Sequence, residues 1–194
     1  MYKMCKTEQS AKRQREIEEA LLSLMLTDRY ENISVSSLCE EKKMPRKAFY
    51  RYFDNKDDCL KALVDHSLME YWNFTEKRHK SGKRDLLSEL ESFFLFFVEN
   101  KQLLDALSKS DMIGILVETS ASAMLSTINA GKFLPDEGEN MRVRILQFSI
   151  CGLMFSMIDW YKRGFDTSTA EMAETALRML SKPLFPNLDG VKLY

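Results

Sequence analysis

One stretch, Ile33–Leu60, constrains the fold of this 194-residue chain more than any other. It is patterned as a helix, a tight turn, a short basic-aromatic helix and the beginning of a third helix. Ser34 is placed to cap the first of these helices, whereas Pro45 disfavours helical geometry at Met44 and suits the first turn of a new helix. Two helices joined by so short a turn, the second of them basic, form the pattern of a helix-turn-helix.

The second helix of this stretch, expected over Arg46–Tyr52, has the composition of a helix that contacts DNA. From Lys42 to Phe53 there are five basic residues and no acidic one. Phe49 and Phe53, four residues apart, are the expected apolar anchors. A solvated basic face packed by aromatic residues is the alternative, but the ordered combination of caps, turn and anchors favours DNA binding. The candidate DNA-contacting residues are Ser34, Arg46, Lys47, Tyr50, Arg51, Tyr52 and Lys56.

The order and spacing of four short motifs are characteristic: Ser34-Val35, Leu38-Cys39, Phe49-Tyr50-Arg51-Tyr52-Phe53 and Lys56 to Leu60. On these motifs, over about residues 10–60, the chain resembles the TetR family of bacterial transcription regulators. Two positions depart from the family pattern. Lys43 stands where the turn usually has Gly, and a lysine there carries a steric penalty if its φ is positive. Pro45 stands where Ser or Thr usually caps the second helix.

The spacing of apolar residues along the whole chain predicts an all-α protein with about nine helices. Only seven Gly and four Pro are present, which suits a helical protein with few irregular loops. We expect a DNA-binding domain of three helices over residues 10–70, with the helix-turn-helix at about 33–52. A helical regulatory and dimerisation domain is expected over residues 71–194. Within it, Phe93–Phe97 is apolar around most of the helix expected over Asp85–Glu99, which therefore lies at the centre.

Small side chains form a stripe on each of the last two helices, expected over Glu139–Arg163 and Thr169–Lys182. Such stripes allow helices to approach closely, either within one chain or between two copies in a four-helix bundle. The resemblance to the TetR family favours the homodimer, because the last two helices form the interface in that family. The candidate interface residues are Ser149, Gly152, Ser156, Ala170, Ala173, Ala176, Leu177 and Leu180.

The same resemblance implies a small-molecule effector that binds among the helices of the C-terminal domain. The chain contains 12 Met and 12 Phe, which suit an apolar or amphipathic ligand but equally suit an ordinary core. The candidate pocket residues are Trp72, Phe96, Met112, Leu116, Phe133, Met154 and Trp160.

Composition and spacing argue against several other functions. The net charge of −1 argues against a protein that coats nucleic acid non-specifically. We find no Gly-rich phosphate loop and no Ser/His/Asp or Cys/His arrangement, so no enzyme is expected. Four Cys without CxxC spacing and only two His predict neither a metal site nor another cofactor.

A cytoplasmic location is expected from the distribution of apolar residues. The N-terminal residues Lys3 and Lys6 are not followed by an apolar run, so no signal peptide is predicted. The most apolar stretch, Phe148–Ile158, is too short to span a membrane.

Two functions remain open at this point. The first is a dimeric regulator, usually a repressor in the family that the chain resembles, released from a palindromic operator by a small molecule. The second is a protein-binding co-regulator of the same fold with weak or no DNA binding. The departures at Lys43 and Pro45 leave room for it.

Overall fold

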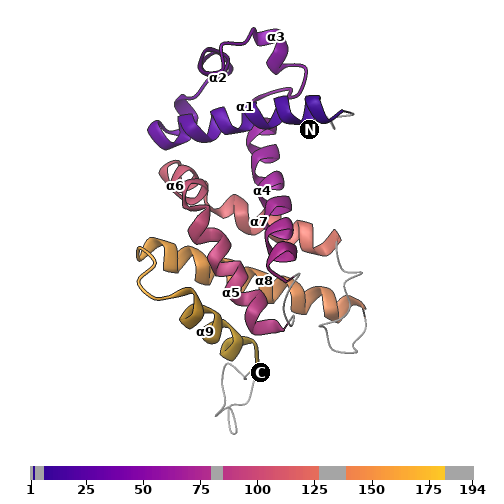
Figure 1. Ribbon diagram of the computed structural model, residues 1–194, viewed down its shortest axis with the longest axis vertical. Coiled ribbons are helices and arrows are strands. Elements are labelled where there is room, and N and C mark those ends of the chain that lie inside the picture. Colours follow the sequence, from indigo (N-terminus) through magenta and orange to yellow (C-terminus); the bar gives the residue numbers. More distant parts are fainter. Residues whose placement is uncertain (1, 3–6, 80–84, 127–138, 182–194) are drawn as a thin grey trace, which may run out of the picture.

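The computed structural model describes Tyr2 and residues 7–79, 85–126 and 139–181, and these residues form helices joined by short connections (Figure 1). The prediction of an all-α protein with about nine helices is confirmed for this part of the chain. A 3₁₀ turn, η1, spans Tyr30–Asn32. The α-helices are α1 (Glu8–Thr27), α2 (Val35–Glu41), α3 (Arg46–Phe49), α4 (Lys56–His79), α5 (Leu86–Glu99), α6 (Lys101–Lys109), α7 (Gly114–Ser126), α8 (Glu139–Lys162) and α9 (Thr169–Ser181).

Helix α4 connects the two ends of the molecule. Figure 1 shows α1, α2 and α3 together at one end, with α4 running from them to the group formed by α5 to α9. Helix α4 packs on α1, α5 and α7, and α1 also packs on α6. The helix is continuous through residue 70, where the sequence suggested a domain boundary. Division into two domains at that residue therefore stays a prediction.

Buried side chains from α1 to α4 form the core of the first end. Ile17 and Leu21 of α1, Leu38 of α2 and Phe49 and Phe53 around α3 are fully buried. Ile17, Leu21 and Met25 lie four residues apart and form one buried side of α1, against which α2 packs.

Helix α5 occupies the centre of the other end, as its run of phenylalanines predicts. It packs on α4, α6 and α9. Phe94, Phe96 and Phe97 are buried, and the ring of Phe94 meets the buried Trp160 of α8 edge-on with centroids 5.6 Å apart. A helix covered on three sides needs apolar residues around most of its circumference, which explains the uninterrupted run.

Helix α9 packs on α5, which corrects part of the predicted dimer interface. Ala173 and Ala176 are buried within the single chain, so they are not available to a second copy. Gly152, Ala170 and Leu180 are exposed, and the remaining predicted residues are half-buried. The spacing of small residues shows that a close approach occurs, but it does not show which helix approaches.

The turn between α2 and α3 is closed by a residue with a left-handed backbone. Lys43 has a φ of 47°. The N–H of Lys43 donates to the Glu40 carbonyl at 3.0 Å, and the N–H of Met44 donates to the Cys39 carbonyl at 2.9 Å. These two bonds form a Schellman motif, whose left-handed position is most often Gly. The steric penalty that the sequence suggested at Lys43 therefore applies.

We expect Lys43→Gly to stabilise the protein, because Gly adopts this backbone conformation without a Cβ clash. The control is Lys43→Ala, which removes the same charge but keeps the Cβ atom. Lys43→Gly should exceed Lys43→Ala in free energy of unfolding by about 1 kcal/mol, or by about 2–4 °C in Tm. Equal thermal stability of the two variants would show that the left-handed turn is unstrained.

Candidate nucleic-acid interface

Helix α3 is only four residues long, so its position depends on the side chains that it buries. Phe49 and Phe53 are fully buried, with their ring centroids 5.4 Å apart. The N–H of Tyr50 donates to the Arg46 carbonyl at 3.2 Å, and that of Phe53 donates to the Phe49 carbonyl at 3.2 Å. The two phenylalanines therefore hold one side of this helical segment to the core and leave the other side open.

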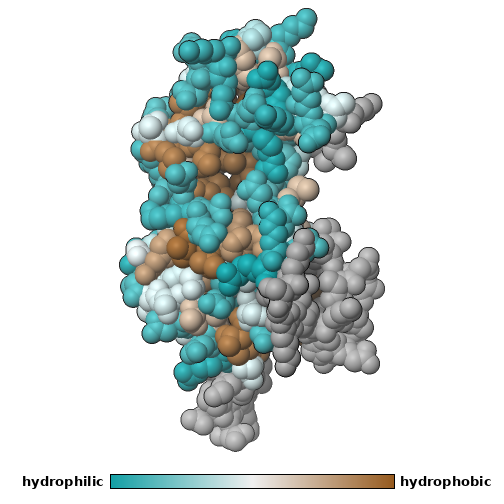
Figure 2. All heavy atoms as spheres, viewed as in Figure 1, coloured by the Kyte–Doolittle hydropathy of each residue, from teal (hydrophilic) through white to brown (hydrophobic). Residues whose placement is uncertain are grey.

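The open side of this segment presents cationic and hydroxyl groups. Arg46, Lys47, Tyr50 and Arg51 are all exposed. The guanidinium of Arg46 donates to the hydroxyl of Tyr50 at 3.2 Å and lies 5.9 Å from the centre of its ring. This hydrogen bond raises the pKa of Arg46 above its ordinary, already high value, so the guanidinium is charged. Figure 2 shows mainly hydrophilic residues over this end of the molecule.

Two cations of this surface, Lys47 and Arg51, are not neutralised by a neighbouring carboxylate among the described residues. Lys47 and Arg51 form no ion pair with any other residue in the described part of the chain. Lys42, in the turn before α3, lies 4.0 Å from the carboxylate of Glu19. Unpaired cations on a protruding helix are able to contact phosphates and base edges of duplex DNA.

Tyr52 is not part of this surface, contrary to the sequence-based prediction. Its side chain is only 7% exposed and packs beside Phe53. The regular helix ends at Phe49 rather than at Tyr52, because the N–H of Tyr52 donates to the Phe49 carbonyl three residues back. This tighter step turns the Tyr52 ring toward the core.

Ser34 and Lys56 were predicted to contact DNA, but both have structural partners. The Ser34 hydroxyl accepts the Ser37 backbone N–H at 3.0 Å and caps α2, while the backbone N–H of Ser34 donates to the Ser37 hydroxyl. The ammonium of Lys56 donates to backbone carbonyls between α1 and α2. Sequence spacing placed both residues at the right helix ends, but it did not show these local acceptors.

The cysteines of this region are placed as core residues. Cys39 and Cys59 are buried, and burial raises the pKa of both thiols. A thiol with a raised pKa is a weak nucleophile and a poor metal ligand. Within the described residues, no three His, Cys, Asp or Glu side chains come together as a metal site requires.

The predicted effector-pocket residues differ in their burial. Phe96, Leu116, Met154 and Trp160 are buried in the core, whereas Trp72 is exposed. Met112 is half-buried, and Phe133 lies outside the described residues. The effector pocket therefore stays a prediction.

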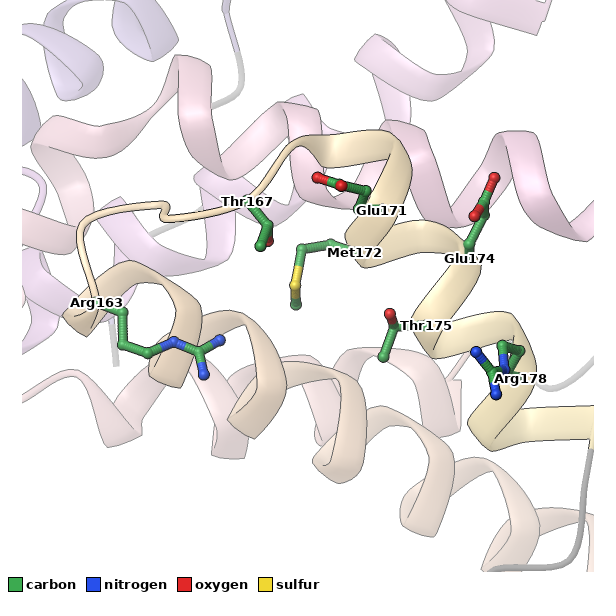
Figure 3. Close-up of a pocket in the computed structure, with 7 residues that line it drawn as sticks. All are labelled: Arg163, Thr167, Glu171, Met172, Glu174, Thr175 and Arg178. Carbon is green, nitrogen blue, oxygen red and sulfur yellow. The ribbon is translucent and has the colours of Figure 1, made fainter.

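A cleft of about 400 Å³ lies elsewhere, between the end of α8 and α9 (Figure 3). Met172 and Thr175 point into it from α9, and Arg163 closes one end. Arg163 already pairs with Asp159 and Asp166 at 3.2 Å each. Apart from Met172, the residues that line the cleft are polar or charged: Arg163, Thr167, Glu171, Glu174, Thr175 and Arg178.

Comparison with known proteins finds similar structures but no similar sequence. No protein-family model matches the chain, and no curated protein matches it. A TetR-family transcriptional regulator from Syntrophomonas wolfei has a similar structure, with a TM-score of 0.62 and 19% identity over 88% of this chain and 93% of that one. The chain has the TetR-type fold.

Two further solved structures have the same TM-score. One is the fatty acid degradation regulator FadR from Bacillus halodurans, with a TM-score of 0.62 and 13% identity over 93% of this chain and 98% of that one. The other is a TetR transcriptional regulator from Streptococcus agalactiae, with a TM-score of 0.62 and 17% identity over 90% and 96% of the two chains. At such low identities the similarity establishes the architecture, and the resemblance seen in the sequence is confirmed at that level.

The two tyrosines of this segment provide a direct test of the interface. We expect Tyr50→Ala to weaken binding to duplex DNA by about tenfold, because it removes an exposed hydroxyl and the ring that supports Arg46. Tyr52→Phe should change the dissociation constant less than twofold, because that side chain is buried. Fluorescence anisotropy with labelled duplex measures both. A larger effect of Tyr52→Phe than of Tyr50→Ala would contradict this orientation of the segment.

Proposed function

We propose that this protein is a DNA-binding transcription regulator that acts as a homodimer. The observation that carries the proposal is the exposed, cationic side of α3, held by Phe49 and Phe53 at the tip of a TetR-type fold. In this account α3 enters the major groove, with Arg46 and Lys47 toward base edges. Tyr50 and Arg51 contact the phosphates beside them.

Each copy supplies few cations, which favours binding by two copies at once. Residues 1–60 carry 12 basic and 11 acidic side chains, so this part of the chain is nearly neutral. Non-specific affinity for DNA grows with the number of phosphates that a protein neutralises. Two linked helix-turn-helix units would double that number and would require a palindromic operator, with half-sites about 34–36 Å apart or a multiple of that distance.

An exposed apolar face on α8 supports the homodimer. Phe148 is 69% exposed and Phe155 is 64% exposed, with the exposed Gly152 between them at helical spacing. The segment Val143–Lys162 is apolar and long enough to cross a membrane, yet its opposite side packs on α7. A contact between two copies through α8, of the type found in four-helix bundles, covers these rings without a membrane.

A small-molecule effector is the remaining part of the proposal. The indole Nε1 of Trp160 and the hydroxyl of Ser120 are buried, and neither has a hydrogen-bond partner in the described part of the chain. Buried polar atoms without partners are rare in protein interiors. A hydrogen-bond acceptor of an amphipathic ligand, bound beside either atom, would supply the missing partner. By favouring one distance between the two helix-turn-helix units over another, the ligand would release the operator, as a ligand-responsive repressor does.

Selection of DNA fragments from the source genome by the purified protein tests the proposal. We expect enrichment of one or a few palindromes, and loss of that enrichment in the Arg46→Ala, Lys47→Ala double variant. The matched control is Lys61→Ala, Lys77→Ala on α4, which removes two exposed cations from a helix that is not expected to reach DNA. Absence of enrichment even at low salt would contradict DNA binding and would favour the protein-binding co-regulator.

The dimer is tested by placing a charge on the exposed face of α8. Phe155→Glu should convert the homodimer to a monomer in analytical ultracentrifugation, because an unpaired carboxylate would be buried between two copies. Met69→Glu on α4, where the side chain is 58% exposed, is the control and should leave the dimer intact. A Phe155→Glu protein that remains dimeric would exclude α8 from the interface.

A further inference from the structure

The ammonium of Lys56 is enclosed by backbone carbonyls of the connector, residues 28–33, which joins α1 to α2. Its Nζ donates to the carbonyls of Tyr30 at 2.7 Å, Ile33 at 2.9 Å and Glu31 at 3.3 Å. It also lies 4.3 Å from the centre of the Tyr30 ring, within the range of a cation–π contact. A lysine ammonium has three N–H groups, so these three carbonyls use its donor capacity completely.

Within the connector, Tyr30 forms hydrogen bonds through its hydroxyl, its backbone N–H and its carbonyl. Its hydroxyl donates to the carboxylate of Asp57, next to Lys56 in the first turn of α4. Burial and this hydrogen bond both raise the pKa of Tyr30, so the hydroxyl remains a donor. The backbone N–H of Tyr30 donates to the buried hydroxyl of Ser110, just after α6, at 2.7 Å. Tyr30 thus connects the start of α4 to the end of α6.

The end of α6 makes further contacts with the same region. Lys109 donates to the carbonyls of Leu26 at 3.0 Å and Thr27 at 2.8 Å, which are free acceptors at the end of α1. Asp111 accepts a hydrogen bond from the guanidinium of Arg29 at 3.1 Å. Three consecutive residues at the end of α6 therefore bind the end of α1 and the connector.

We infer that Lys56 is a positioning residue for the helix-turn-helix rather than a phosphate contact, and that it makes the orientation of α2 and α3 depend on the position of α6. The inference rests on the proposed DNA-binding function. The Ile33 carbonyl that Lys56 holds immediately precedes Ser34, the residue that caps α2. A shift of the connector therefore moves the start of α2 and, with it, the turn and α3.

Helix α6 is in turn connected to α8, the helix proposed to contact the second copy. The Tyr161 hydroxyl donates to the carboxylate of Asp105 on α6 at 2.8 Å. Side-chain hydrogen bonds thus run from α8 to α6, from α6 to the connector, and from the connector to Lys56. Contiguous contacts of this kind can carry coupling between distant sites through an element with two arrangements, and the inference assigns that role to α6.

The salt dependence of operator binding distinguishes positioning from phosphate contact. Each phosphate that a protein neutralises adds about 0.9 to the slope of log Kd against log salt concentration. We expect Lys56→Met to weaken operator binding about tenfold with an unchanged slope, whereas Arg51→Met, which removes a proposed phosphate contact, should reduce the slope by about one per subunit. A slope reduced equally by both variants would overturn the inference, because Lys56 would then bind phosphate.

Hydrogen exchange without DNA tests the same inference independently of the proposed function. We expect Ser110→Ala to increase amide exchange severalfold over residues 30–38, because the Tyr30 N–H then has no side-chain acceptor. Gln102→Ala, which alters an exposed side chain on the same helix outside these contacts, is the control and should leave that exchange unchanged. Unchanged exchange in Ser110→Ala would overturn the connection to α6. If the unaltered protein binds no DNA, the proposed function fails and this experiment alone decides the inference.

Discussion

The burial of Phe49 and Phe53 is the constraint on which the proposed interface depends. A helix of four residues has too few internal hydrogen bonds to be stable by itself, so α3 depends on two buried rings that fix it to the core beside α2. The same burial decides which side of the segment faces outward. Removing either ring would cost about 3–5 kcal/mol and would release the residues that are proposed to reach DNA.

Many features of the fold follow from local rules and were predictable from the sequence. Ser34 caps α2 as its position suggests, and it forms a reciprocal pair of hydrogen bonds with Ser37, three residues later. The phenylalanine run of α5 also predicted that this helix lies at the centre of its end of the molecule. Periodicity and capping depend on residues near in sequence, which explains why these predictions are confirmed.

The predictions that were wrong concern contacts between residues distant in sequence or a single step of backbone geometry. Tyr52 turns inward because one hydrogen bond shortens from four residues to three, a change that its residue type does not signal. Lys56 meets carbonyls about 25 residues before it, and Ser110 meets Tyr30 from 80 residues away. Ala173 and Ala176 allow a close approach but do not specify α5 as the partner. Such contacts depend on the tertiary fold.

The most direct test of the central claim is hydroxyl-radical footprinting of the protein on a fragment that it selects. Two copies, each presenting α3, predict two protected patches on one face of the duplex, related by the symmetry of the palindrome and about 34–36 Å apart or a multiple of that distance. Protection should disappear with Arg46→Ala, Lys47→Ala. A single patch, or uniform protection without symmetry, would contradict the account of a dimeric regulator that reads DNA through α3.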